Sequence, residues 1–282
     1  MPHRTITQVL SSGFEQVAPG LYIKRPLPTP EVKHADPFLM LDHFGPMSVK
    51  PGETNQVPPH PHKGFCPVTL LFAGQVQHRD SLGNDLTLHA GDIGWMTAGN
   101  GIVHEETFTH APDDPDRVLH GIQLWVNLPT AHKRVAPSYQ HVTADQLPTL
   151  DRCNHQVRLL VGEYEGQKSP VTTHTPITLL EVTGEANSEV TLQLPADHTA
   201  AIYNLTGSAA LGDTAWQENE LALLSEGESV TYQLTAASHQ LVLIGEPHHQ
   251  RMASYGPYVM NNMREVIDAI QEYERGDFGE LA

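Results

Sequence analysis

The sequence predicts an all-β protein with two antiparallel β-barrels, or jelly rolls, and a short helix near its C-terminus. Short apolar and β-branched runs alternate with glycine turns through both halves of the chain, a pattern typical of antiparallel barrels. Glycine and proline each occur 22 times in 282 residues, as a turn-rich all-β chain requires. Near the end, apolar residues change to helical spacing at Met263, Val266, Ile267, Ile270 and Tyr273.

The first half contains a run of short strands between glycine turns. Strands are expected over residues 68–72, 86–88 and 93–96, with another ending at Asp80. Asp80 and Ser81 are expected to bond the backbone locally where that strand meets its turn. In such a barrel, strands that are distant in sequence can converge on one interior site.

The second half repeats this strand rhythm, which indicates a divergent internal duplication. Between the halves lies a polar stretch in which Pro129, Pro137 and Pro148 interrupt regular elements. We therefore expect a first barrel over 1–130, a linker over 131–153, a second barrel over 154–247 and a C-terminal extension over 248–282. In the extension, Asn262 and Glu265 are expected to cap the helix, and Gly276 to end it.

Two short motifs indicate a metal site. In a strand, residues i and i+2 share a face, so His60 projects with His62, and His104 with Glu106. Pro61 keeps the first pair out of a helix. Three imidazoles and one carboxylate suit iron(II), nickel, copper, manganese or zinc, whereas calcium and magnesium prefer oxygen ligands.

Other candidate residues have simpler interpretations. Alternation turns Glu105 away from the face of His104. Cys66 could place a thiol near the metal, but the role of a small buried hydrophobic residue is favoured. The second half has no His-x-His and no His-x-Glu; His198 and His239 stand alone there, and we expect that barrel to be structural.

Composition narrows the function classes. Thirty-three acidic against 16 basic residues give a net charge of −17, which argues against direct nucleic-acid binding. Two cysteines suit a reducing cytoplasm better than a disulfide scaffold. The N-terminus lacks the apolar run of a signal peptide, and no segment is long enough to cross a membrane. We expect a soluble cytoplasmic protein.

Several segments together resemble a known family. They are residues 38–46, 60–65, 78–83, 91–104, 123–129 and 255–261. The chain resembles a cupin, and specifically the pirin family of bicupins, which includes flavonol (quercetin) 2,3-dioxygenases. The resemblance implies metal ligands at His60, His62, His104 and Glu106 and a C-terminal helix against the first barrel. It departs at Cys66, where cupins often have a glutamate.

The resemblance also implies a cofactor and an activity. One divalent transition metal is expected, iron(II) foremost, with nickel, copper, manganese, cobalt or zinc as alternatives. The implied activity opens the central ring of flavonols such as quercetin with O2, and Glu106 would serve as ligand and as base for the 3-hydroxyl proton. The alternative is a metal-dependent, redox-sensing binding protein whose partner is a transcription factor or a metabolic enzyme. Fold alone does not choose between the two.

Overall fold

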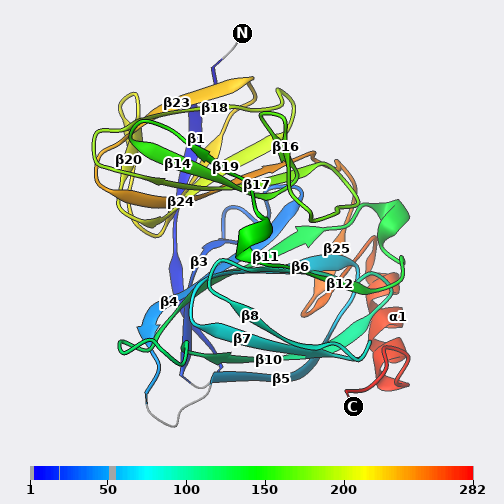
Figure 1. Cartoon of the computed structure of the whole chain (residues 1–282). Coiled ribbons are helices and arrows are strands. Elements are labelled where there is room, and N and C mark those ends of the chain that lie inside the picture. Colours follow the sequence, from blue (N-terminus) through cyan, green and yellow to red (C-terminus); the bar gives the residue numbers. More distant parts are fainter. Residues whose placement is uncertain (1–2, 19, 51–54, 282) are drawn as a thin grey trace. The chain divides into compact units, whose positions relative to one another are not determined.

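The computed structural model describes residues 3–18, 20–50 and 55–281; residues 1–2, 19, 51–54 and 282, which the predicted domains include, lie outside that part. Antiparallel strands dominate it, and α1 (Met263–Glu274) is a short helix near the C-terminus (Figure 1). The predicted fold class is therefore confirmed. No helix in the described residues combines the length and apolar character that crossing a membrane requires.

The chain forms two compact units, and both are discontinuous in sequence. The first barrel consists of Phe14–Ile23, Phe38–Ala144 and His248–Ala282. The second barrel consists of Met1–Gly13, Lys24–Pro37 and Asp145–Pro247.

The first barrel contains a seven-stranded and a four-stranded sheet. The larger sheet has the order β12 (Ser138–Val142), β9 (Ile93–Thr97), β6 (Phe65–Ala73), β11 (Val118–Asn127), β4 (Phe38–Ser48), β3 (Leu21–Leu27), β2 (Gly13–Ala18). The smaller has the order β5 (Asn55–His62), β10 (Ile102–Thr109), β7 (Gln75–Asp80), β8 (Asp85–His89). Phe44 and Leu71 of one sheet share a buried cluster with Val76 and Phe108 of the other. The two sheets thus enclose a common interior.

The second barrel repeats this plan. Its larger sheet has the order β1 (Ile6–Ser11), β22 (Glu220–Leu224), β19 (Thr199–Thr206), β24 (Ser238–Gly245), β17 (Ile177–Gly184), β14 (His155–Val161), β13 (Thr149–Asp151). Its smaller sheet has the order β18 (Glu189–Gln193), β23 (Ser229–Leu234), β20 (Ala209–Leu211), β21 (Thr214–Trp216), and β15 (Glu163–Tyr164) pairs with β16 (Gln167–Lys168). Buried Trp216 and Tyr232 from the smaller sheet pack with Val242 from the larger.

Chain order and barrel membership differ from the predicted boundaries at two places. The strand Ile6–Ser11 pairs with β22 in the second barrel, although residues 1–130 were expected in the first. The expected linker, 131–153, contains β12 and β13 and so adds an edge strand to each barrel. Pro137 and Pro148 precede these strands directly and therefore remove no hydrogen bond within them.

The C-terminal extension joins the first barrel, as the resemblance implies. β25 (Ala253–Tyr255) pairs with β26 (Tyr258–Met260), and buried Val266 and Ala269 of α1 share a cluster with Val103 of β10. The predicted caps are present. The side chain of Asn262 accepts a hydrogen bond from the Glu265 amide at 3.1 Å, and Gly276 has φ +81° just after the helix.

Two buried lysines hold this extension beside the end of β5. The Lys63 amide donates to Pro257 O at 3.2 Å, and its ammonium lies 2.7 Å from a carboxylate oxygen of Glu272 in α1. The Lys133 ammonium donates to Val259 O at 2.9 Å and to Gly64 O at 2.8 Å. Gly64 itself has φ +85°, and a side chain there would collide with the carbonyl of Val259.

Candidate metal centre

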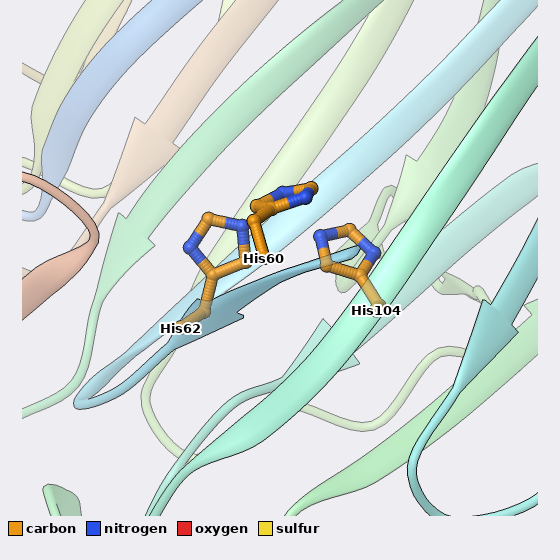
Figure 2. Close-up of side chains that lie close together, drawn as sticks. All are labelled: His60, His62 and His104. Carbon is orange, nitrogen blue, oxygen red and sulfur yellow. The ribbon is translucent and has the colours of Figure 1, made fainter. Parts of the chain in front are cut away.

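Adjacent strands of the smaller sheet bring the three predicted histidine ligands together. β5 and β10 pair with His60 opposite His104, and His62 follows two residues later on the same face. Ring centroids lie 4.3 Å apart for His60 and His104, 4.7 Å for His60 and His62, and 4.9 Å for His62 and His104. One nitrogen from each ring falls within 4.8 Å of the others. Figure 2 shows the three rings gathered around one point.

The chemical state of these rings fits metal binding. Burial, reinforced by neighbouring imidazoles, holds the pKa of His62 and of His104 well below the usual value for histidine. Both are therefore neutral near pH 7, the form that binds a metal. Nε2 of each is buried without a hydrogen-bond partner among the described residues. Buried polar atoms are rarely left unpaired, so the position of these nitrogens fits the role of metal ligands.

A hydrogen bond to the backbone determines the tautomer of His60. Its Nδ1 lies 2.8 Å from the carbonyl oxygen of Pro58. A carbonyl can only accept, so Nδ1 carries the proton and a neutral His60 has a lone pair on Nε2. A backbone group thus fixes the tautomer of this ring.

Glu106 lies on the face of His104, in agreement with strand alternation. The pairing of β10 with β7 is regular through His104, Glu105 and Glu106. The Glu106 carboxylate accepts from Thr69 Oγ1 at 3.2 Å and from Gln123 Nε2 at 3.3 Å. Its oxygen belongs to a group with His78 and His104, within 4.8 Å, rather than to the group of three predicted histidines. The structure therefore places Glu106 beside His104 and His78, and His104 is the one residue that the two groups share.

Glu105 points elsewhere. Its carboxylate accepts from Arg79 Nη1 at 2.7 Å and from Gln56 Nε2 at 3.3 Å. These contacts use the opposite face of β10, so Glu105 and Glu106 form a natural pair for comparison.

Replacing Glu106 by glutamine should weaken metal binding by about tenfold or more, because a charged donor beside the histidines is lost. Glu105→Gln removes the same charge from the other face and should leave metal content nearly unchanged. Metal analysis of both variants after equilibration with a competing chelator measures the difference. Equal losses would contradict the observed alternation.

His78 was not predicted as a site residue, yet it lies within the centre. It is opposite Glu106 on β7 and is buried. Its ring stacks on Tyr139 with centroids 3.9 Å apart, and its Nε2 lies 3.0 Å from Asp80 Oδ2. The signal was the alternation of His78 and Asp80, which the sequence interpretation treated only as a strand end. The predicted local role of Asp80 is present as well, because Oδ1 accepts from the Leu82 amide at 2.9 Å.

The two ionisable side chains that contact His78, Asp80 and Tyr139, both have shifted pKa values. Burial alone would raise the pKa of Asp80, but hydrogen bonds from His78 and Asn84 outweigh it and lower that pKa. Burial, together with the nearby carboxyls of Glu106 and Asp80, raises the pKa of Tyr139 well above its usual value. Asp80 is therefore an anion and Tyr139 a neutral phenol near pH 7.

Cys66 faces away from the histidines. Phe65 contacts His62, with ring centroids 5.2 Å apart, and Thr69 contacts Glu106, so odd-numbered residues of β6 face the centre. The Cys66 thiol instead lies 3.7 Å from Thr97 Oγ1 on the other side. Burial raises its pKa to about 12, which leaves it protonated and unreactive.

Only one thiol should react with iodoacetamide in the native protein at pH 8. Cys153 is exposed, whereas Cys66 is buried and protonated. Mass spectrometry should find one alkyl group on the folded chain and two after unfolding in urea. Modification of Cys66 at the rate of Cys153 would contradict this assignment.

Aromatic side chains lie beside the centre. The Trp125 ring centroid is 5.4 Å from that of His62 and 4.3 Å from that of Phe65. By contrast, a hollow of about 540 Å³ lies in the second barrel among Glu163, Glu165 and Glu228, and none of the predicted ligands lines it.

Two barrels of antiparallel strands, one of them with convergent histidines, define the bicupin class of proteins. The model of the family "Pirin" matches residues 20–126, and that of the "Pirin C-terminal cupin domain" matches residues 179–279. The chain belongs to the pirin family.

Similar proteins cover most of the chain. A Pseudomonas aeruginosa protein named "Putative quercetin 2,3-dioxygenase" is 36% identical over 87% of this chain and 87% of its own length. Human "Pirin" is 34% identical over 98% of this chain and 94% of its own. The crystal structure of a quercetin 2,3-dioxygenase from Acinetobacter baumannii superposes with a TM-score of 0.92 at 32% identity, covering 99% of both chains.

Proposed function

We propose that this protein is a metal-dependent dioxygenase that opens the central ring of flavonols such as quercetin. The observation that supports it most is the convergence of His60, His62 and His104, two of them buried and neutral, with Glu106 alongside. Relatives at 36% and 32% identity bear the name of this activity.

The proposed metal ligands are His60, His62, His104 and Glu106. This donor set suits a divalent transition metal, iron(II) foremost, with nickel, copper, manganese, cobalt or zinc also compatible. When bound, the metal supplies positive charge and orientation for an oxygen anion of the substrate.

The protein's own residues would prepare the substrate. The flavonol 3-hydroxyl must lose its proton before the electron-rich ring can react with O2, and Glu106 is placed to accept that proton. Thr69 and Gln123 donate to the same carboxylate and hold its plane. Trp125 is partly exposed and packs on the buried ring of Phe65, so it offers an apolar surface for a flat aromatic ligand.

Loaded with iron(II), the protein should bleach quercetin, consuming one O2 and releasing one carbon monoxide for each ring opened. Glu106→Gln should lower turnover by about 100-fold or more, the usual contribution of a general base. Glu105→Gln is the matched control. The assay follows flavonol absorbance and dissolved O2 at metal concentrations that restore occupancy in every variant.

The same assay separates the second candidate function. A metal-loaded wild type that leaves flavonols untouched would contradict the dioxygenase proposal. If binding of a protein partner then followed the oxidation state of the metal, the regulatory role would replace it. The alignment with human "Pirin" over 98% of this chain is the observation that supports this second candidate.

A further inference from the structure

His104 meets a strict chemical requirement if it is to bind a metal through Nε2. A neutral imidazole carries one proton, so Nε2 has a lone pair only when Nδ1 holds that proton. Backbone or carboxylate acceptors usually fix this choice for ligand histidines. For His60 the acceptor is Pro58 O. His104 Nδ1 instead faces a second histidine.

The second histidine is His78, and each of its two ring nitrogens has a hydrogen-bond partner. His78 Nδ1 is 3.4 Å from His104 Nδ1, and His78 Nε2 is 3.0 Å from Asp80 Oδ2. His78, Asp80 and His104 are each at most 2% exposed. Stacking on Tyr139, with an angle of 19° between the planes, holds the orientation of the His78 ring.

Asp80 determines the direction of this chain of hydrogen bonds. Its carboxylate also accepts from the amides of Leu82 and Asn84, at 2.9 and 3.1 Å, and from Asn84 Nδ2 at 2.8 Å. An anion that accepts so many bonds requires His78 Nε2 to be the donor. A neutral His78 then has its lone pair on Nδ1, where it can accept only from His104 Nδ1–H. The remaining lone pair is on His104 Nε2, which is the buried nitrogen without a partner among the described residues.

We infer that Asp80 and His78 form a hydrogen-bond relay that fixes the tautomer and orientation of His104 and so sets the metal affinity of the centre. Both are positioning residues, since His78 uses its two nitrogens on Asp80 and His104. The part of this inference that concerns affinity rests on the proposed metal function. The tautomer itself does not require a metal.

Two variants of His78 separate the relay from mere packing. His78→Asn places an amide oxygen near the former Nδ1 and can still accept from His104, although it no longer reaches Asp80. His78→Leu fills a similar volume but accepts nothing. Circular dichroism and thermal melts of both variants control for folding.

The first measurement uses metal-free protein labelled with ¹⁵N histidine. Two-bond ¹⁵N–¹H correlations distinguish the two neutral tautomers, and loss of a signal in His104→Gln assigns His104. The wild type and His78→Asn should show His104 protonated at Nδ1, whereas His78→Leu should shift it towards Nε2–H. Protonation of His104 at Nε2 in the wild type would overturn the relay.

The second measurement is cobalt(II) affinity by chelator competition, followed in the visible spectrum. His78→Leu should bind 10–100-fold more weakly, as loss of an outer hydrogen bond to a ligand usually does, and His78→Asn should recover about tenfold of that loss. Equal losses in both variants, or a shifted cobalt band in His78→Asn that marks a lost ligand, would overturn the inference. A wild type that binds no cobalt would refute the proposed metal function, while the tautomer measurement alone would still decide whether the relay exists.

Discussion

His62→Ala should abolish stoichiometric metal binding. The wild type should hold about one metal ion per chain, because the three histidines and Glu106 can close one site. His62 is 2% exposed, and its neutral ring can donate a lone pair without first losing a proton. Its removal takes away a direct ligand, so the loss should exceed the roughly 100-fold that an outer hydrogen bond can cost.

The measurement combines metal analysis with thermal melting. A ligand at 100 times its Kd stabilises the native state by about 2.7 kcal/mol, so added metal should raise the Tm of the wild type and leave that of His62→Ala unchanged. His198→Ala, in the second barrel, should behave like the wild type. His104→Ala, on a different strand, should repeat the result and exclude a local folding defect. Two equivalents shared by both barrels would contradict a single site.

Lys133→Met should destabilise the first barrel by roughly 2–4 kcal/mol. The ammonium donates to Gly64 O, Asn127 Oδ1 and Val259 O at 2.5–2.9 Å, and the side chain is buried. Methionine has a similar length but no donor, and each buried acceptor left unpaired costs about 1–3 kcal/mol. Release of the buried charge offsets part of that sum.

Urea unfolding of metal-free protein measures this effect. Lys168→Met is the matched control, because the Lys168 ammonium is exposed and pairs only with the exposed carboxylate of Glu163 at 2.7 Å among the contacts described. Such surface pairs contribute about 1 kcal/mol or less. If both substitutions lowered the unfolding midpoint equally, the bonds of Lys133 would not hold the extension to the barrel.

Local periodicity was sufficient to predict much of the fold and part of the centre. Alternation predicted that His60 and His62 share one face of their strand and that His104 and Glu106 share one face of theirs. The antiparallel pairing of β5 with β10 then places the histidines of both strands side by side. Helical spacing and the Asn262 cap likewise predicted α1. In each case the physical rule acts between residues two to four positions apart.

Features without a local signal in the sequence depend on partners far along the chain. Pairing of Ile6–Ser11 with β22 joins residues more than 200 positions apart, and no local pattern specifies such a partner. The position of His78 beside His104 and Glu106 follows from the pairing of β7 with β10. The favoured role of Cys66 as a small buried residue agrees with its 2% exposure, but which side of β6 faces the histidines depends on the pairing of the strands.

The discontinuity of the two barrels has a consequence for synthesis on the ribosome. Residues 248–282 complete the first barrel beside Lys63 and Gly64, yet they are translated after the whole of the second barrel. The nascent strands that carry His60, His62 and His104 must therefore remain without their final neighbours while about a hundred further residues emerge, a delay of roughly 5–20 s at ordinary elongation rates. The second barrel has all its segments earlier and can fold first. Final packing of the first barrel can therefore begin only after the segment that starts at His248 has left the ribosome, when every segment of the second barrel has already emerged.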